Sequence, residues 1–328
     1  MNKQWRVWLG AGALMLAAAA QADYSKHPQA NAFVDTMVSK HGFQRVEVER
    51  WLSAAERQQS ILDAIARPAE KAKPWSEYRK IFLTSDRIQQ GVQFWREHAD
   101  ELARVEKELG VSPAVVVAIL GVETRFGRHM GNYRVLDALA TLGFDYPPRA
   151  DFFRTQLEEY FVLVREQGFV ADRLKGSYAG AMGLGQFMPS SYRNFAIDFD
   201  GDGVVDIISN PYDAIGSIAN YLKQHGWKAG TPAVAPANVG ATAPDSLLTQ
   251  DLRPVKTIAQ FRQQGVATPL KVPDDTQAAL FKLDGDLGVE YWLGFNNFYV
   301  ITRYNRSQMY AMAVLQLSEA IAAQRARG

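Results

Sequence analysis

The chain has 328 residues, of which 47% are hydrophobic, 11% aromatic and 22% charged. This length and composition predict two or three folded domains and exclude disorder as the main state of the chain. The formal net charge is +1, so no strong field directs the chain to nucleic acid or to an anionic membrane. The chain has no cysteine, which excludes disulfides, thiolate metal sites, a catalytic cysteine and lipid attachment at cysteine.

The N-terminus has the pattern of an export signal. Lys3 and Arg6 precede an apolar run at residues 7–20, and residues 20–22 (Ala-Gln-Ala) supply the small side chains of a cleavage site. The run is shorter than the roughly 20 apolar residues that a transmembrane helix needs. We therefore expect cleavage after Ala22 and a soluble mature protein in the periplasm. The alternative is a buried N-terminal helix.

Helical periodicity dominates the chain after the signal. Residues 23–105 alternate apolar and charged positions with a helical period. A further helix is predicted from Ser112 and Pro113, which are typical of a helix start, to a stop at Gly127. Its surface is apolar on all sides, so we expect it to be central and buried. Other helices are predicted at residues 151–166, 213–225 and 307–325.

The segment from residue 229 to about residue 283 has a different composition. It contains repeated X-Pro pairs, at Pro232, Pro236, Pro244, Pro254, Pro269 and Pro273. Because proline interrupts helices, these pairs predict a small mixed or β insert within the helical chain. The fold class expected from the whole pattern is mainly α (α+β).

Glu123 is the first candidate for chemistry, because it follows nine residues that carry no charged or strongly polar side chain. Burial and a place in the last turn of a helix are both expected to raise the pKa of this carboxyl. A carboxylic acid that keeps its proton near neutral pH is what general acid catalysis requires. The alternative is an ordinary ion pair with Arg125 or Arg128 at the helix end.

Residues 176–192 (GSYAGAMGLGQFMPSSY) form a glycine-rich segment. Its glycines would let the backbone and the side chains of Ser177, Gln186 and Tyr192 approach a bulky ligand closely. It lacks the GxxxxGK[ST] pattern of a phosphate loop, and the chain has neither a zinc-binding histidine spacing nor a GxSxG elbow. The alternative is a tight loop that only packs against a helix.

Together with residues 119–127 (ILGVETRFG) and 297–307 (NFYVITRYNRS), this loop resembles the lytic murein transglycosylases of the B type, whose core has a goose-lysozyme-like fold. The resemblance implies cleavage of the β-1,4 bond between N-acetylmuramic acid and N-acetylglucosamine, with formation of a 1,6-anhydromuramoyl end. It implies that Glu123 is the single catalytic acid/base. The substrate-binding positions that it implies are Ser177, Gln186, Tyr221, Tyr304, Asn305 and Tyr310.

One carboxyl is sufficient if the N-acetyl group of the muramoyl sugar takes the place of a second one, as in substrate-assisted glycosidases. Tyr304 and Tyr310 would suit the faces of sugar rings, although core packing is the alternative for both. We also consider Arg149 as a contact for stem-peptide carboxylates. Two other functions stay open: a hydrolytic muramidase of the lysozyme type, and a non-catalytic murein-binding scaffold organised by calcium.

An EF-hand pattern begins at Asp198, with the sixth-position glycine at Gly203. The expected ligands of one structural Ca²⁺ are Asp198, Asp200, Asp202, the Val204 carbonyl and Asp206. Position twelve is Ser209 where the pattern has a bidentate Glu, and Asp213 is the candidate that replaces it. The alternative is an acidic turn without metal.

The resemblance also defines the expected architecture, which has a lysozyme-like helical core. The expected divisions are a signal peptide (1–22), an N-terminal helical region (23–105), the catalytic core with the EF-hand-like loop (106–228), the insert (229–291) and a segment that completes the core (292–328). Members of the family are often lipoproteins, and the lack of cysteine predicts a soluble member. The expected partners are peptidoglycan glycan strands, together with cell-wall synthesis or division proteins, and no nucleic acid.

Overall fold

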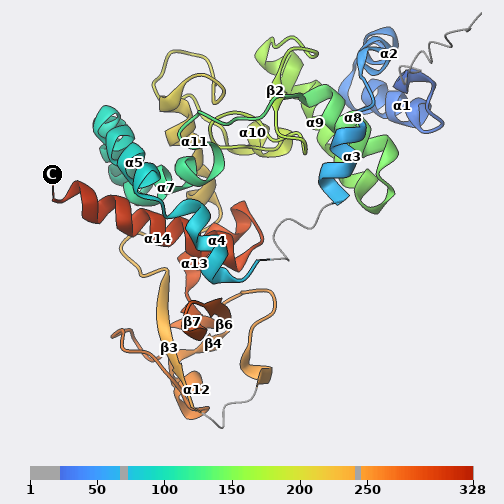
Figure 1. The fold of residues 1–328 in the computed structure, drawn as a ribbon. Helices are drawn as coiled ribbons and strands as arrows, with labels where there is room; N and C mark the ends of the chain where they lie inside the picture. The colour runs from blue at the N-terminus through green and yellow to red at the C-terminus, as the bar shows by residue number, and fades with distance from the viewer. Residues whose placement is uncertain (1–22, 67–72, 241–244, 328) are drawn as a thin grey trace, which may run out of the picture.

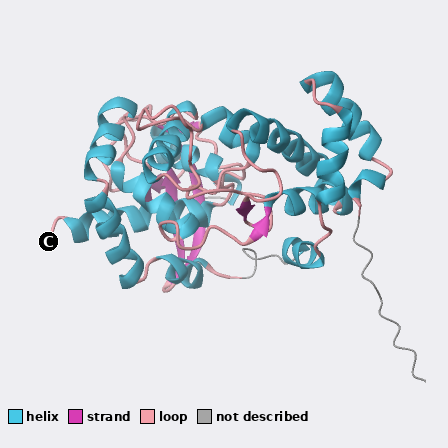
Figure 2. Cartoon of the chain, turned by 90° about the horizontal axis from the view of Figure 1, so that it is seen from above, coloured by secondary structure: helices cyan, strands magenta, loops and turns pink. Residues whose placement is uncertain are grey.

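The structure is a computed structural model that describes residues 23–66, 73–240 and 245–327. Helices make up most of it, and the strands gather in two places (Figure 2). The helices of the first half are α1 (Ala30–His41), α2 (Arg45–Ala54), α3 (Gln59–Ala66), α4 (Trp75–Phe82), α5 (Ser85–Glu97), α6 (Ala99–Leu109) and α7 (Pro113–Thr124). The later helices are α8 (Val135–Asp145), α9 (Ala150–Gln167), α10 (Pro189–Phe195), α11 (Pro211–Gln224), α12 (Ile258–Gln263), α13 (Asn296–Tyr304) and α14 (Gln308–Arg325).

The helices pack in two groups that do not follow chain order (Figure 1). In one group, α8 and α9 pack on each other, α3 packs against α8, and α1 packs against α9. In the other, α14 packs against α4, α5 and α7, while α11 packs against α6 and α7. The helices before residue 106 therefore divide between the two groups, and α10 contacts both α9 and α11. The predicted division of the chain at residue 106 remains a proposal.

The strands form two sheets. β1 (Tyr133–Arg134) pairs with β2 (Lys175–Gly176), which places the start of the glycine-rich loop beside the segment after α7. The larger sheet is antiparallel with the order β4-β6-β7-β3-β5. Its strands are β3 (Val234–Val239), β4 (Lys256–Thr257), β5 (Val266–Ala267), β6 (Gln277–Gly285) and β7 (Gly288–Gly294).

The larger sheet has its own small core and also packs on the helices. Successive side chains of a strand point to opposite faces, and β6 uses both faces. Leu280 belongs to a separate apolar cluster with Phe261 and Leu293, whereas Phe281 and Leu283 belong to the main core. Phe281 stacks on Phe298 of α13 with ring centroids 4.6 Å apart. The sheet region therefore joins the helices through β6.

α7 is the central helix of the main core. Ser112 and Pro113 begin it, as the sequence predicts, and most of its side chains are buried. It ends at Thr124, three residues before the predicted stop at Gly127. Arg125, Phe126 and Gly127 all have positive φ, so the backbone leaves the helix directly after Thr124.

The main features of the fold agree with the sequence predictions. The protein is mainly helical with small β sheets, which confirms the predicted fold class. The helices predicted at residues 151–166, 213–225 and 307–325 correspond to α9, α11 and α14. The larger sheet begins in the proline-rich segment with β3 to β6, and its strand β7 follows that segment. The predicted signal peptide lies outside the described residues.

Candidate active site and cation loop

Glu123 lies in the last turn of α7, where its half-buried carboxyl meets the first turn of α14. The Tyr310 hydroxyl donates a hydrogen bond of 2.6 Å to Glu123 Oε1. Burial and then the charge of Glu123 raise the pKa of the Tyr310 phenol well above its usual range, so Tyr310 stays a donor at neutral pH. Arg125, an alternative partner of Glu123 in the sequence, instead pairs with Asp86 of α5.

The residue after Glu123 fixes the end of α7 to the glycine-rich loop. Thr124 is fully buried, and its hydroxyl donates to the Leu184 carbonyl at 2.9 Å. The same hydroxyl accepts the Gly127 N–H at 3.0 Å. A buried hydroxyl with both partners supplied holds the two segments in one arrangement. The loop and the catalytic candidate are therefore joined through Thr124.

The glycine-rich loop is closed by its own hydrogen bonds. Ser177 Oγ accepts the Ala181 N–H at 3.0 Å and the Ala179 N–H at 3.3 Å, so this hydroxyl shapes the turn. Gln186 has a positive φ of 52°, and its side-chain amide donates to the carbonyls of Met130 and Gly183 at 3.1 and 2.9 Å. These contacts hold both side chains in defined positions.

Tyr304 and Gly185 form the second contact between the loop and the C-terminal segment. The Tyr304 hydroxyl donates to the Gly185 carbonyl at 2.5 Å. A Cβ at residue 185 would lie 2.9 Å from that hydroxyl oxygen, so the close approach requires glycine. Burial, and then the charge of Glu123, raises the pKa of Tyr304 well above its usual range. Tyr304, like Tyr310, is therefore a phenol close to the Glu123 carboxylate.

The ring of Tyr221 on α11 packs against the ring of Tyr304. Their ring centroids are 4.9 Å apart, and the Tyr221 hydroxyl donates to the Arg303 carbonyl at 2.6 Å. Burial raises the pKa of Tyr221 to about 12. Asn305 follows Tyr304 as the C-cap of α13, and its carbonyl accepts the Ser307 N–H at 2.7 Å. The structure thus links Glu123 to Tyr310 and Tyr304 to Tyr221. Ser177 and Gln186 lie on the glycine-rich loop that Thr124 and Tyr304 contact, and Asn305 lies next to Tyr304 in the chain.

Arg149 and Tyr192 have different surroundings. Arg149 lies between α8 and α9, in the other helix group, and its guanidinium lies over the Phe152 and Phe153 rings at 4.3 and 5.2 Å. Tyr192, expected to approach a ligand, is buried instead, and its hydroxyl donates to the Val205 carbonyl at 2.7 Å. It therefore connects α10 to the acidic loop.

Sequence reasoning missed two residues of this site. Thr124 is a polar residue in an apolar helix, which is a signal that could have been followed. Tyr78 of α4 is 6% exposed and close enough to Tyr310 for its charge to affect the pKa of that phenol. No motif links Tyr78 to Glu123 in the sequence, because both come beside Tyr310 only when α4 and α7 pack on α14.

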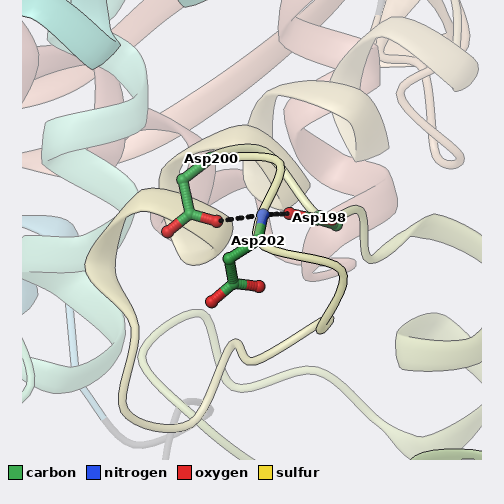
Figure 3. A group of neighbouring side chains, drawn as sticks. All are labelled: Asp198, Asp200 and Asp202. Atoms are coloured by element: carbon green, nitrogen blue, oxygen red, sulfur yellow. Dashed lines mark hydrogen bonds between the residues drawn. The ribbon is translucent and has the colours of Figure 1, made fainter.

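The acidic loop that follows α10 brings three carboxylates together (Figure 3). One oxygen from each of Asp198, Asp200 and Asp202 lies within 4.8 Å of the others. Backbone N–H groups of Gly203, Gly201 and Asp202 donate to Asp198 and lower the pKa of its carboxyl. Clustered carboxylate oxygens on the loop suit a hard cation such as Ca²⁺.

Two other predicted calcium ligands, Asp206 and Asp213, accept hydrogen bonds from backbone N–H groups of the acidic loop. Asp213 is fully buried, and its two oxygens accept the N–H groups of Phe199 and Asp206, both at 2.7 Å. Burial raises its pKa despite these bonds. Asp206 accepts the Ile208 and Ser209 N–H groups at 2.8 and 2.9 Å, and the Val204 N–H donates to Asp202. Asp206 and Asp213 thus shape the loop around the three clustered carboxylates.

The acidic loop is also attached to the glycine-rich loop. The Leu184 N–H donates to the Ile207 carbonyl at 3.0 Å. Gly183 has a φ of +71°, and a Cβ there would lie 2.3 Å from that same carbonyl oxygen. The two loops therefore share one backbone contact that leaves no room for a side chain.

A half-buried carboxyl held by a phenol beside a glycine-rich loop suits acid/base cleavage of a polysaccharide. The chain belongs to the family described as "Transglycosylase SLT domain", whose model matches residues 25–319. A curated relative is the membrane-bound lytic murein transglycosylase B of Escherichia coli, strain K12, 45% identical over 309 residues, which are 92% of this chain and 84% of the relative.

Solved structures of lytic transglycosylases are similar along most of the chain. Soluble SltB1 of Pseudomonas aeruginosa has a TM-score of 0.86 at 53% identity, over 91% of this chain and all of that chain. Slt35 of Escherichia coli, in complex with calcium, has a TM-score of 0.84 at 45% identity, over 93% and 96%. SltB3 of Pseudomonas aeruginosa, in complex with NAG-NAM-pentapeptide, has a TM-score of 0.79 at 33% identity, over 89% and 78%.

These relatives include a membrane-bound and a soluble protein. Within residues 23–66, 73–240 and 245–327, no helix combines the length and the apolar character needed to cross a membrane.

Proposed function

We propose that the protein cleaves the bond between N-acetylmuramic acid and N-acetylglucosamine in peptidoglycan and leaves a 1,6-anhydromuramoyl end, with Glu123 as the single acid/base. Family membership makes the chain a peptidoglycan lytic transglycosylase. The observation that supports the role of Glu123 is its carboxyl at the end of the buried helix α7, held by the Tyr310 phenol at 2.6 Å.

The first step is protonation of the leaving group. Glu123 gives its proton to the bridging oxygen, which departs as the 4-hydroxyl of N-acetylglucosamine when the C1–O bond breaks. The carbonyl oxygen of the muramoyl N-acetyl group forms a bond to C1 from the other face, giving an oxazolinium ion. The Tyr310 hydrogen bond favours the carboxylate that Glu123 becomes in this step, and it fixes the direction of that carboxylate.

The second step closes the anhydro ring. The Glu123 carboxylate removes the proton of the muramoyl 6-hydroxyl, and that oxygen attacks C1 as the bond from C1 to the acetyl oxygen breaks. Glu123 is protonated again, the acetamido group is restored, and no water is consumed. Because the 6-hydroxyl belongs to the same sugar, its effective concentration is high, and ring closure outruns hydrolysis where water is excluded.

The other site residues would hold the sugar and keep water away. Tyr304 and Tyr221 form an aromatic cluster with Phe187, whose ring centroid is 5.8 Å from that of Tyr304. Ser177, Gln186 and Asn305 provide polar groups near it that suit hydroxyl and N-acetyl groups. Arg149 stays a proposed contact for a stem-peptide carboxylate, at a place outside this cluster.

We propose that Ca²⁺ binds the acidic loop and has a structural role. The clustered oxygens of Asp198, Asp200 and Asp202 provide the donors, with the Val204 carbonyl, Asp206 and Asp213 as further candidate ligands. When Ca²⁺ orders the acidic loop, the hydrogen bond from the Leu184 N–H to the Ile207 carbonyl would also restrict the motion of the glycine-rich loop. A calcium complex of Slt35, a relative at 45% identity, supports this proposal.

We propose that the protein acts in the periplasm as a soluble enzyme, because the sequence has the pattern of an export signal and no cysteine for a lipid anchor. Its partners would be glycan strands and cell-wall synthesis or division proteins. A relative bound to NAG-NAM-pentapeptide supports peptidoglycan as the substrate.

The test is mass spectrometry of the soluble products formed when the purified mature protein digests murein sacculi, beside a Glu123→Gln variant. We expect muropeptides lighter by one water than hydrolytic products from the wild type, and none from the variant. Products of full hydrolytic mass would make the protein a muramidase of the lysozyme type. Wild type without products would favour the murein-binding scaffold.

A further inference from the structure

Two adjoining cavities lie between the sheet region and the C-terminal helices. The larger, of about 610 Å³, is bounded by the start of α4, by β6 and by the turn between α13 and α14. The smaller, of about 310 Å³, is bounded by residues 250–253 and by α13. Gln250, Leu252 and Arg306 line both, so the cavities form one continuous groove, called the basic groove below.

Cationic side chains outnumber carboxylates along the basic groove. The carboxylates in its lining are Asp251 and Asp284, and the cations are Lys73, Lys282, Arg253, Arg303 and Arg306. Since the whole chain has a net charge of only +1, this concentration of positive charge is local to the groove. It favours an anionic ligand.

The cations differ in how far protein carboxylates already neutralise them. Arg253 lies 3.9 Å from Asp251, and Lys282 lies 3.6 Å from Asp245. In the part of the chain that the structure describes, neither Arg303 nor Arg306 has a carboxylate within ion-pair distance. Arg303 and Arg306 are therefore the groups that an external anion would neutralise.

The guanidinium of Arg303 is held in place without being fully hydrogen-bonded. It lies over the Tyr299 ring at 4.1 Å, and its Nη2 donates to Thr302 at 2.9 Å. Its Nε is buried and has no hydrogen-bond partner among the described residues. Because a buried donor without a partner is costly, this arrangement is explained best by a ligand that supplies an acceptor.

The basic groove lies about one helical turn from the candidate active site. On α4, Trp75 lines the groove and Tyr78 lies three residues later. On α14, Ser307 lines the groove as the N-cap, and Tyr310 lies three residues later. One turn of helix advances about 5.4 Å, and an extended peptide spans about 3.3–3.6 Å per residue. A peptide of a few residues on a sugar beside Glu123 is therefore long enough to enter the groove.

We propose that the basic groove binds the carboxylates of a peptidoglycan stem peptide, with Arg303 and Arg306 as the principal contacts. This inference rests on the proposed function, because the stem peptide is the anionic part of that substrate. Planar guanidinium groups bind carboxylates through two parallel hydrogen bonds, which ammonium groups cannot do. The groove would thereby make the enzyme prefer glycan that still carries its peptides.

The first experiment measures binding to the otherwise intact Glu123→Gln protein by titration calorimetry, with NAG-NAM-pentapeptide and the NAG-NAM disaccharide as probes. We expect the pentapeptide form to bind about tenfold more tightly, as a hydrogen-bonded charged group allows. Arg303→Gln together with Arg306→Gln should remove most of that difference and leave the affinity for the disaccharide unchanged. The matched control is Arg50→Gln, an exposed arginine on α2.

Two results would overturn the proposal: equal binding of the two probes by the parent protein, or an unchanged preference in the double variant. Arg306→Gln alone, an exposed position where folding is not at risk, should still lower the preference. A result that refutes stem-peptide binding in the basic groove does not refute the proposed function. The latter is decided by the mass of the products that the wild type releases from sacculi, whatever the affinities show.

Discussion

The glycine-rich loop and the acidic loop are neighbours that reach order in different ways. The glycine-rich loop is fixed by contacts from distant parts of the chain, through Thr124 and Tyr304. In the acidic loop, Asp198 is bound by N–H groups of its own next few residues, while Asp200 and Asp202 are exposed. Contacts between distant segments thus fix the glycine-rich loop before any ligand binds. The acidic loop instead concentrates negative charge that a cation would neutralise.

The largest effect is expected at the acid/base itself. Glu123→Gln keeps the shape of the side chain but cannot transfer the proton, so turnover on sacculi should fall by at least about 10³-fold. The melting temperature should stay close to that of the wild type, because the hydrogen bond from Tyr310 has an acceptor in either case. The control is Glu106→Gln, an exposed position on α6, which should keep full activity. An active Glu123→Gln protein would remove the assignment.

The next effect tests how far Tyr310 supports Glu123. Tyr310→Phe deletes the hydroxyl that donates to Glu123, and a hydrogen bond to a charged group contributes about 1.5–3 kcal/mol. We expect turnover to fall by about 10- to 100-fold with little change in the affinity for substrate. Tyr212→Phe, at a tyrosine of α11 that is 38% exposed, is the matched control. Full activity of Tyr310→Phe would mean that the contact is only packing.

Calcium should affect stability far more than turnover. Saturating Ca²⁺ should raise the melting temperature by several degrees, since each kcal/mol of ligand stabilisation shifts it by about 2–4 °C in a chain of 150–250 residues. Asp200→Asn with Asp202→Asn should abolish this shift in differential scanning fluorimetry, whereas Asp63→Asn, an exposed position on α3, should keep it. A wild type that melts identically with calcium and with chelator, and that carries no metal in elemental analysis, would refute the calcium proposal.

The smallest effect concerns the ion pair that holds α10, which begins within the glycine-rich segment, to α9. Arg193 binds Glu166 at 2.8 Å and lowers the pKa of that carboxyl below its ordinary 4.5. The pair therefore stabilises the fold above pH 4.5, and its contribution disappears as the pH falls through the lowered pKa. Because Glu166 is 42% exposed, Glu166→Gln should cost under about 1 kcal/mol at pH 7.

Urea unfolding at pH 7 and at pH 3 measures that contribution. The difference between wild type and Glu166→Gln should shrink at the lower pH, because protonation of the carboxyl also removes the pair. A difference that is the same at both pH values would show that packing, and not charge, determines the effect.

The features that the sequence predicted are those that short segments determine. α7 begins at Ser112 and Pro113 as expected, because capping is a local property. Its end was predicted three residues too late, because Arg125 and Phe126 adopt positive φ without being glycine. Their conformation depends on tertiary contacts, including the stacking of Phe126 on Phe94 at 5.5 Å.

The candidate site was also predicted only in part, because some of its residues come together only through contacts between distant segments. Glu123 and the glycine-rich loop were found from residue types and from the family resemblance, and the structure brings them together. Tyr78 was missed because helices far apart in the sequence place it beside Tyr310. Thr124 could have been found, since a buried hydroxyl in an apolar helix needs partners.

The bond between Tyr310 and Glu123 joins residues that are 187 positions apart in the sequence. Closing so long a segment costs chain entropy that is recovered only when α7 and α14 pack together. The acid/base and its phenol partner are therefore assembled by tertiary packing and not by local structure. A chain in which α7 and α14 have not packed together therefore lacks the phenol that holds the Glu123 carboxyl, and its catalytic site is incomplete.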